Sequence, residues 1–258
     1  MFEAKLPNAA LLKKIIDSIK DFLNDAPFDC TENGVCLQAM DSSHVALVSL
    51  NLASSLFERY RCDRTISFGM SFANVGKALK CANNDDTCTI RCNDDDYVVF
   101  SFEDNRTQEV TVRMMDIDSE HLGIPDQDYS AVVTMSAIDF QKTCKDLAMF
   151  SDSVVITVTK GGVEFTGKGD TGSSVVHYAP SGTNDNGSVL LTVKEPVNVN
   201  FSAKYMNYFT KATSLSKKVK LSLSNGLPIV VEYSLDEEGK SYLRFFLAPK
   251  IQEDEDDN

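Results

Sequence analysis

The chain has 258 residues, of which 43% are hydrophobic and 24% are charged, a composition typical of a globular protein. No apolar run approaches the roughly 20 residues that span a bilayer, and the first residues lack the pattern of a secretory signal, so we expect an intracellular protein without membrane contact. The net charge of −13 argues against a protein that coats nucleic acid non-specifically, because an acidic surface repels phosphate.

The seven cysteines are odd in number and form no C-x-x-C motif, which predicts neither a disulfide framework nor a zinc site. Cys88 and Cys92 fall on one face of an expected strand, and we interpret them as small buried apolar side chains. The run Asp94–Asp96 lacks the alternating ligands and the glycine of a calcium loop and is interpreted as a hairpin turn. No catalytic residue, cofactor or metal site is predicted.

The first half begins with an amphipathic helix over Asn8–Leu23, in which apolar residues recur at i, i+3, i+4 and i+7. A second helix is expected over Ser71–Lys80, and Asn8 and Ser71 stand at the expected N-caps. Strands over Cys88–Cys92 and Tyr97–Phe102 follow, with apolar residues at a period of two. An exposed connector over 118–128, with a glycine, a proline and several carboxylates, ends this half.

The second half begins with a helix over Ser136–Met149, and another helix is expected over Ser202–Thr213. A serine stands at the expected N-cap of each. The last residues, 252–258, form an acidic tail with nothing apolar to bury. The strands expected in this half are Val154–Val158, Val189–Val193 and Ile229–Tyr233.

The two halves repeat each other in sequence. Residues 65–104 align with 196–235 at a constant offset of 131, and 32–41 align with the segment from Lys160 at an offset of 128. The three additional residues lie in a Gly/Ser/Asn-rich loop at 181–188, where insertion is tolerated. The repeat predicts an α+β fold of two similar β-rich domains, each with two helices. The expected parts are a domain over 1–117, the connector over 118–128, a domain over 129–251 and the tail over 252–258.

Positive charge concentrates on the four expected helices, which carry nine lysines and four aspartates, a sum of +5 that leaves −18 for the remaining chain. One interpretation is that these lysines are ordinary solvated helix faces. Their presence on all four helices favours the alternative, a single positive surface that contacts the phosphates of a polyanion without sequence preference. We expect no aromatic stacking platform among the lysines, which disfavours recognition of single strands.

Four separated motifs carry a family resemblance: Asp41–Val45 (DSSHV), Tyr60–Arg64 (YRCDR), Leu122–Pro125 (LGIP) and Leu247–Ile251 (LAPKI). In this order they resemble the proliferating cell nuclear antigen family, the eukaryotic DNA sliding clamps, over essentially the full length. The resemblance implies the DNA clamp fold, a homotrimeric ring with the helices inside and the sheets outside. It also implies a nuclear, non-enzymatic processivity factor that encircles double-stranded DNA.

The resemblance implies that one subunit joins the next through the strands near Arg106–Arg113 and Gly172–Ala179, which removes unpaired strand edges. Met149 stands where many relatives have a basic residue, so the positive track is expected to be thinner there. The implied DNA-facing residues are Lys13, Lys14, Lys20, Lys77, Lys80, Arg106, Lys142, Lys145, Lys204 and Lys211.

A hydrophobic pocket for replication and repair enzymes is implied as well. Phe246 replaces the family's usual tyrosine, which keeps the ring contact and loses a hydroxyl, and Lys160 matches the family's ubiquitin-acceptor lysine. The implied partners are DNA polymerase delta, the clamp loader, flap endonuclease, DNA ligase and other proteins with a glutamine-plus-aromatic motif. The pocket residues are Met40, His44, Val45, Leu47, Leu122, Ile124, Pro228, Phe246, Ala248, Pro249 and Ile251.

Other protein classes remain as alternatives. The segment Gly162–Lys168 superficially matches a nucleotide-binding P-loop, but Gly169 replaces the hydroxyl residue and the intervening residues alternate like a strand. Asp41, Ser42 and His44 are the residue types of a catalytic triad, yet real triads are assembled across a fold. A checkpoint-clamp subunit of a heterotrimer and a monomeric viral processivity factor are closer alternatives, and the retained pocket motifs favour the replicative homotrimer.

Overall fold

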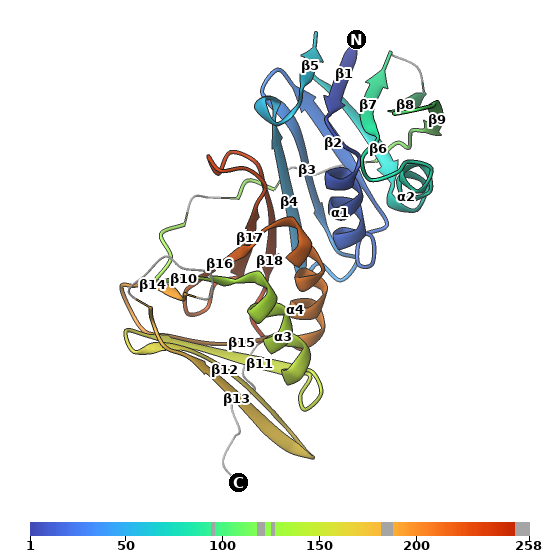
Figure 1. Ribbon diagram of the computed structural model, residues 1–258. Helices are drawn as coiled ribbons and strands as arrows, with labels where there is room; N and C mark the ends of the chain where they lie inside the picture. Colours follow the sequence, from blue (N-terminus) through green and yellow to red (C-terminus); the bar gives the residue numbers. More distant parts are fainter. Residues whose placement is uncertain (94–95, 118–121, 125–126, 182–187, 251–258) are drawn as a thin grey trace. The chain divides into compact units, whose positions relative to one another are not determined.

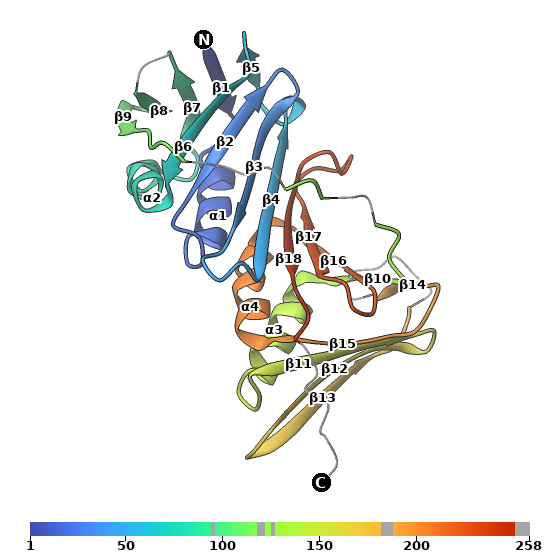
Figure 2. The ribbon, with the colours of Figure 1, turned by 180° about the vertical axis from the view of Figure 1, so that it is seen from behind.

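The computed structural model describes residues 1–93, 96–117, 122–124, 127–181 and 188–250. The chain divides into two compact units, which can be followed by colour in Figures 1 and 2. The first unit comprises residues 1–124 together with 234–244, and the second comprises 125–233 together with 245–258. The first unit therefore takes in a short segment from near the C-terminus.

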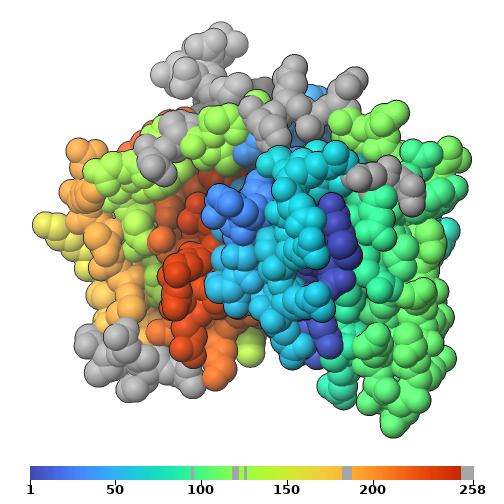
Figure 3. Space-filling model, turned by 90° about the horizontal axis from the view of Figure 1, so that it is seen from above, coloured from blue at the N-terminus to red at the C-terminus, as the bar shows by residue number. Residues whose placement is uncertain are grey.

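The first unit is built from two runs of antiparallel strands and two helices, α1 (Ala10–Ile19) and α2 (Phe72–Lys80), with a short 3-10 turn η1 (Ser54–Leu56). The strand orders are β5-β1-β7-β8-β9 and β4-β3-β2-β6. In Figure 3 the dark blue N-terminal residues lie between cyan and green segments, as expected for β1 between β5 and β7. The strands are β1 (Phe2–Leu6), β2 (Asp25–Thr31), β3 (Gly34–Met40), β4 (Ala46–Ala53), β5 (Arg59–Cys62), β6 (Ile66–Ser71), β7 (Thr87–Cys92), β8 (Tyr97–Glu103) and β9 (Thr107–Arg113).

The second unit is built from the same kinds of element, with helices α3 (Ala137–Leu147) and α4 (Ala203–Phe209) and a 3-10 helix η2 (Thr210–Leu215). Its strand orders are β14-β10-β16-β17-β18 and β13-β12-β11-β15, again with antiparallel pairs. Figure 1 shows α3 and α4 side by side against these strands. The strands from here to the end of the chain are β10 (Ala131–Ser136), β11 (Ser153–Thr159), β12 (Gly162–Gly169), β13 (Gly172–Tyr178), β14 (Leu190–Val193), β15 (Val197–Ser202), β16 (Lys218–Leu223), β17 (Ile229–Ser234) and β18 (Tyr242–Leu247).

The duplication predicted from the sequence is confirmed by these strand orders, which become identical when β1 is matched with β10, β2 with β11 and so on along the chain. Even a backbone detail repeats. Gly34 and Gly162, 128 residues apart, open β3 and β12 with φ angles of +146° and +152°. A Cβ atom would lie 2.1 Å from the Leu52 carbonyl oxygen at Gly34 and 2.5 Å from the Tyr178 carbonyl oxygen at Gly162. Glycine is therefore required at both hairpins.

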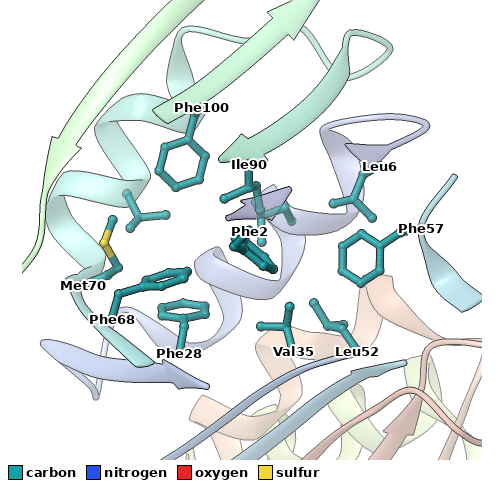
Figure 4. A pocket seen from close by; sticks show the side chains of 12 residues that line it. Phe2, Leu6, Phe28, Val35, Leu52, Phe57, Phe68, Met70, Ile90 and Phe100 are labelled. Carbon is teal, nitrogen blue, oxygen red and sulfur yellow. The ribbon is translucent and has the colours of Figure 1, made fainter. Parts of the chain in front are cut away.

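An aromatic cluster forms the core of the first unit (Figure 4). The rings of Phe28 and Phe68 stack at 5.8 Å, and Phe2 meets Phe68 at 5.9 Å. A cavity of about 30 Å³ remains between these rings and the surrounding aliphatic side chains, and its lining is apolar throughout. A space of this size and character is a packing gap in the core and offers a polar ligand nothing to bind.

The four predicted helices are confirmed, but their ends differ from the sequence-based boundaries. The first helix ends at Ile19, whereas Leu23 stays buried beyond its end and prolongs the apolar periodicity. Its N-cap is Ala9 and not Asn8, and no side chain caps it. The helix expected to reach Met149 ends at Leu147, as α3. The helix expected to reach Thr213 ends at Phe209, as α4, and the chain continues in the 3-10 helix η2.

Serine does occupy the three other N-caps as predicted, at Ser71, Ser136 and Ser202. Only the Ser136 side chain accepts a hydrogen bond there among these three, from the backbone N–H of Asp139 at 3.3 Å. The serines at the other two positions therefore act through their extended backbone and small size.

The cysteines are all free thiols. Cys88 and Cys92 are buried, as predicted, and burial raises the pKa of the Cys88 thiol to about 12, so that it stays protonated at neutral pH. The expected Asp94–Asp96 turn falls largely outside the described residues, although β7 and β8 pair antiparallel on either side of it.

Candidate nucleic-acid interface and partner-binding residues

In the first unit, the predicted DNA-facing lysines lie on the helix faces opposite the core. The helix α1 buries Leu12, Ile15 and Ile19, and α2 buries Val75 and Leu79. Lys14, Lys20, Lys77 and Lys80 are exposed. A groove of about 330 Å³ between the two helices is lined by Lys13, Lys20, Lys80, Asp17, Ile16, Gly76 and Leu79. Gly76 leaves open space in this groove, since a Cβ atom there would meet nothing within 4 Å.

Two of the predicted DNA-facing residues, Lys13 and Arg106, form hydrogen bonds at the C-terminal end of α2. The Lys13 ammonium donates to the Ala82 carbonyl at 2.5 Å and to Asn84 Oδ1 at 3.3 Å, and the Arg106 guanidinium donates to the Cys81 carbonyl at 3.2 Å. Helix C-termini leave carbonyl groups without intrahelical partners and favour cations. Lys13 and Arg106 therefore stabilise the end of the helix that carries Lys77 and Lys80.

Lys20 has an acidic neighbour on its own helix. Its ammonium lies 2.5 Å from Asp17 Oδ1, three residues earlier. A phosphate that binds Lys20 must compete with this carboxylate, so the groove is less positive than its lysines alone imply.

In the second unit, Lys142 and Lys145 are exposed on α3, and Lys204 and Lys211 are exposed on α4 and η2. The sequence predicted no aromatic stacking platform among the lysines, and the structure does place one aromatic ring there, that of Tyr208. The Lys204 and Lys211 ammonium groups both lie over the Tyr208 ring, with ammonium-to-centroid distances of 5.9 and 5.2 Å. The spacing 204, 208, 211 already places these side chains on one helix face, which is the signal that sequence reasoning missed.

Met149 follows α3 and is 70% exposed, so an uncharged side chain lies at the surface position where a thinner positive track was expected.

The predicted partner-binding residues of the first unit lie on β3, on the loop that follows it, at the start of β4 and on the connector. The buried Asp41 carboxylate shapes this loop by accepting the backbone N–H groups of Ser43, Val45 and Ala46 at 3.2, 2.9 and 2.8 Å. His44 takes a positive φ of 55° and its N–H donates to the Asp41 carbonyl at 3.0 Å. His44 and Val45 are thereby held exposed, while Met40 is half-buried and Leu47 is buried beneath them.

The connector residues Leu122 and Ile124 are both exposed. Gln38 fixes Leu122 beside β3 through two hydrogen bonds, from its Nε2 to the Leu122 carbonyl at 3.0 Å and from the Leu122 N–H to its Oε1 at 2.8 Å. Sequence reasoning missed Gln38, because nothing in its neighbourhood along the chain indicates a partner 84 residues away.

Pro228, Phe246, Ala248 and Pro249 belong to the second unit, and their grouping with the first set stays a prediction. Along β18, Phe245 is buried and stacks on Phe209 at 4.6 Å, so Phe246 points to the opposite face and is half-buried. The Lys250 N–H donates to the Asn200 carbonyl at 2.8 Å, which anchors the segment that follows β18. Ile251 lies outside the described residues.

The remaining sequence candidates have plain structural positions. Lys160 is exposed in the turn between β11 and β12. The segment Gly162–Lys168 forms most of β12 and pairs with both β11 and β13, so its backbone N–H groups cannot cradle a phosphate. Across the described ranges, no three His, Cys, Asp or Glu side chains come together as a metal site would need, and no helix is long and apolar enough to cross a membrane.

Two copies of one α+β unit, each with a pair of lysine-bearing helices against antiparallel strands, define a DNA clamp. The family comparisons agree: the N-terminal domain of proliferating cell nuclear antigen matches residues 1–121 and its C-terminal domain matches residues 123–250. Proliferating cell nuclear antigen of Caenorhabditis elegans is 65% identical over 262 aligned residues that cover 99% of each chain.

The chain therefore belongs to the proliferating cell nuclear antigen family. It is a DNA sliding clamp and a polymerase processivity factor that acts as a trimeric ring with replication partners, and this family is a non-enzymatic scaffold family.

Proposed function

We propose that three copies of the chain close into a ring when β9 of one subunit pairs with β13 of the next. Both strands stand at the end of their strand order, where an unpaired row of backbone groups favours addition of another strand. Val175 on β13 is 56% exposed and supplies apolar surface for this joint. Each subunit then contributes β9 to one joint and β13 to the next, so neither of these two edges is left unpaired when the ring closes.

The lysines of α1 and its C-cap, of α2, α3 and α4 and of η2, with Arg106, form the surface that faces duplex DNA in this ring. The observation that supports this most is the repeated placement of lysines on the core-distal faces of both helix pairs in an otherwise acidic chain. Lysine contacts to phosphate are independent of sequence, which suits a protein that moves along DNA. The ring holds DNA topologically, so individual contacts can be weak. We propose no catalytic residue and no cofactor.

Replacing Lys20, Lys77 and Lys80 by Ala tests this surface. The dependence of log affinity for duplex DNA on log salt concentration should become shallower by about 0.9 for each phosphate that the variant no longer neutralises. The matched control replaces Lys160, Lys168 and Lys240, which lie on turns and strands and change the net charge equally. An unchanged slope in the helix variant, or an equal change of slope in the control, would contradict the assignment.

The proposed partner pocket comprises Met40, His44, Val45, Leu47, Leu122, Ile124, Pro228, Phe246, Ala248, Pro249 and Ile251. It accepts the aromatic and aliphatic side chains of a short glutamine-plus-aromatic motif, as in polymerase delta, flap endonuclease, DNA ligase and the clamp loader. The exposed apolar Val45, Leu122 and Ile124 support this assignment, because apolar side chains held at a surface favour a docked partner. Phe246 retains the ring contact.

Ile124→Ala should weaken binding of a glutamine-plus-aromatic peptide by about 1–3 kcal/mol, the range of a buried anchor residue. Isothermal titration calorimetry measures this directly. Met115→Ala is the control, since Met115 is also an exposed apolar residue of the first unit but lies outside the proposed pocket. Equal affinity of wild type and Ile124→Ala would remove the connector from the pocket.

The proposal includes three further assignments. The parts of the chain are a domain over 1–117, a connector over 118–128, a domain over 129–251 and an acidic tail over 252–258. Lys160, exposed in its turn, is the proposed site of ubiquitin attachment, and the protein acts in the nucleus. A checkpoint-clamp subunit, a viral processivity factor and a nucleotide-binding enzyme are not favoured, because the chain is 65% identical to a proliferating cell nuclear antigen over 99% of its length.

A further inference from the structure

The junction between α4 and η2 carries an aromatic ring between two cations. Lys204 precedes Tyr208 by four residues and Lys211 follows it by three, so the three side chains share one helix face. The Lys204 ammonium lies 5.9 Å from the centroid of the Tyr208 ring, and the Lys211 ammonium lies 5.2 Å from it. Both distances are within the range of a cation–π interaction. Both lysines are exposed, and the ring is half-buried.

The ring itself is held in place from several sides. Tyr205 meets it edge-on, with centroids 6.2 Å apart and an interplanar angle of 78°. On one side of Tyr208 in the chain, Asn207 Nδ2 donates to the Cys144 carbonyl at 3.2 Å, and on the other side Gln141 Nε2 donates to the Thr210 carbonyl at 2.9 Å. Since both bonds connect to α3, the turn that carries Tyr208 is fixed to the neighbouring helix.

We propose that Tyr208 is a positioning residue that holds Lys204 and Lys211 as an ordered pair for contact with two phosphates of duplex DNA. This inference rests on the proposed role of the lysines in facing DNA. A lysine side chain is long and flexible, and ordering it on binding opposes the contact. A cation–π interaction at an exposed site favours the ordered side chain by a factor of about two to five, so the ring removes part of that opposition before DNA arrives.

A stacking platform for an unpaired base is the other role that an aromatic ring could have on a DNA-facing surface. The geometry disfavours it, because both ammonium groups already lie over the Tyr208 ring and Tyr205 packs against it in a T-shaped pair. The ring therefore acts on the lysines, and the ligand is the phosphate backbone of a duplex.

The first experiment observes the lysines directly, in the full-length protein without DNA. Reductive 13C-methylation keeps the positive charge, and the NMR signals of Lys204 and Lys211 are assigned by their disappearance in Lys204→Gln and Lys211→Gln. We expect upfield ring-current displacement of both signals in wild type and in Tyr208→Phe, and no such displacement in Tyr208→Leu. Signals that stay unchanged in Tyr208→Leu would overturn the inference.

The second experiment measures affinity for a short duplex as a function of salt. Tyr208→Leu should lower affinity at a fixed salt concentration by about two- to fivefold, with the slope of log affinity against log salt unchanged, because no charge is removed. Tyr208→Phe, which retains the ring, should restore wild-type affinity. Tyr97→Leu is the matched control, an exposed tyrosine on β8 whose removal should have no effect.

The two experiments separate this inference from the proposed function. If Lys204→Gln and Lys211→Gln leave both affinity and salt slope unchanged, the DNA-facing assignment of these lysines fails, whatever the NMR signals show. If those two variants do weaken binding but Tyr208→Leu binds duplex as wild type does, the positioning role fails. Equally weakened binding in Tyr208→Phe and Tyr208→Leu would assign the effect to the phenol hydroxyl, and a selective decrease of single-strand binding would assign it to stacking; either result overturns the inference.

Discussion

Lysines of equal formal charge differ in this chain because their neighbours differ. Lys13 donates to a carbonyl 69 residues away at the end of α2, Lys20 is paired with Asp17, and Lys204 and Lys211 flank an aromatic ring. Helical spacing predicts which lysines share a face, and this prediction was sufficient to find the candidate surface. Helical spacing carries no information on contacts between elements. The hydrogen bonds from Lys13 and Arg106 to carbonyl groups at the C-terminal end of α2 could therefore not be predicted.

Asp17 offers a test of this difference at a single position. Asp17→Asn removes the carboxylate that lies 2.5 Å from the Lys20 ammonium, so Lys20 becomes more available to phosphate. Affinity for duplex DNA at low salt should rise by about two- to fivefold, corresponding to the roughly 0.5–1 kcal/mol of an exposed ion pair. The control is Glu32→Gln, in the turn between β2 and β3, which changes the net charge equally but lies on neither helix. Equal increases in affinity for both variants would show that net charge alone is responsible.

At the scale of elements, the sequence predicted type and order better than ends. Apolar periodicity located all four helices, because a buried helix face leaves a regular pattern. The same rule extended the first helix to Leu23, since a residue that packs in the core from a turn looks identical in sequence to one that packs from a helix. The sequence repeat aligned Gly34 with Gly162, and the structure explains this repeat through backbone crowding at both positions.

These two glycines should tolerate no side chain. Gly34→Ala and Gly162→Ala place a Cβ atom 2.1 and 2.5 Å from carbonyl oxygens at positive φ, and each should lower the free energy of unfolding by about 2 kcal/mol or more. Gly76→Ala is the contrasting variant, because Gly76 lies within α2 with open space around it, and it should raise stability by about 0.5–1 kcal/mol. Urea denaturation measures all three. A neutral Gly34→Ala would show that the β2–β3 hairpin can shift to admit a methyl group.

For the whole molecule, the duplication was readable because both copies keep the same residues at constant offsets, and the matching strand orders confirm it. The partner pocket could be predicted only through family resemblance, because its proposed residues come from separate parts of the chain and share no periodicity. Gln38, which holds Leu122 beside β3, shows why. Its role depends on hydrogen bonds to Leu122 that form only on folding and that no local sequence pattern predicts.

Ring closure is open to a test at the β13 edge. Val175→Asp places a charge on an exposed side chain of this strand, and since burial of an unpaired carboxylate in a subunit joint is unfavourable, the trimer should dissociate. Light scattering should give about three times 28.5 kDa for wild type and a mass near 28.5 kDa for the variant. Ile138→Asp, at an even more exposed position on α3, should leave the trimer intact. A trimeric Val175→Asp would place the joint elsewhere.

The two strands proposed to join subunits, β9 and β13, are unlike each other, and this has a consequence for direction. Subunits that join through unlike edges all follow one another in the same rotational sense, so a closed circle of them has a front and a back that no symmetry operation exchanges. Any docking residue then recurs three times on a single side. Threaded on a duplex, such a molecule carries its polarity with it, and every enzyme that it tethers is presented toward the same end of the DNA.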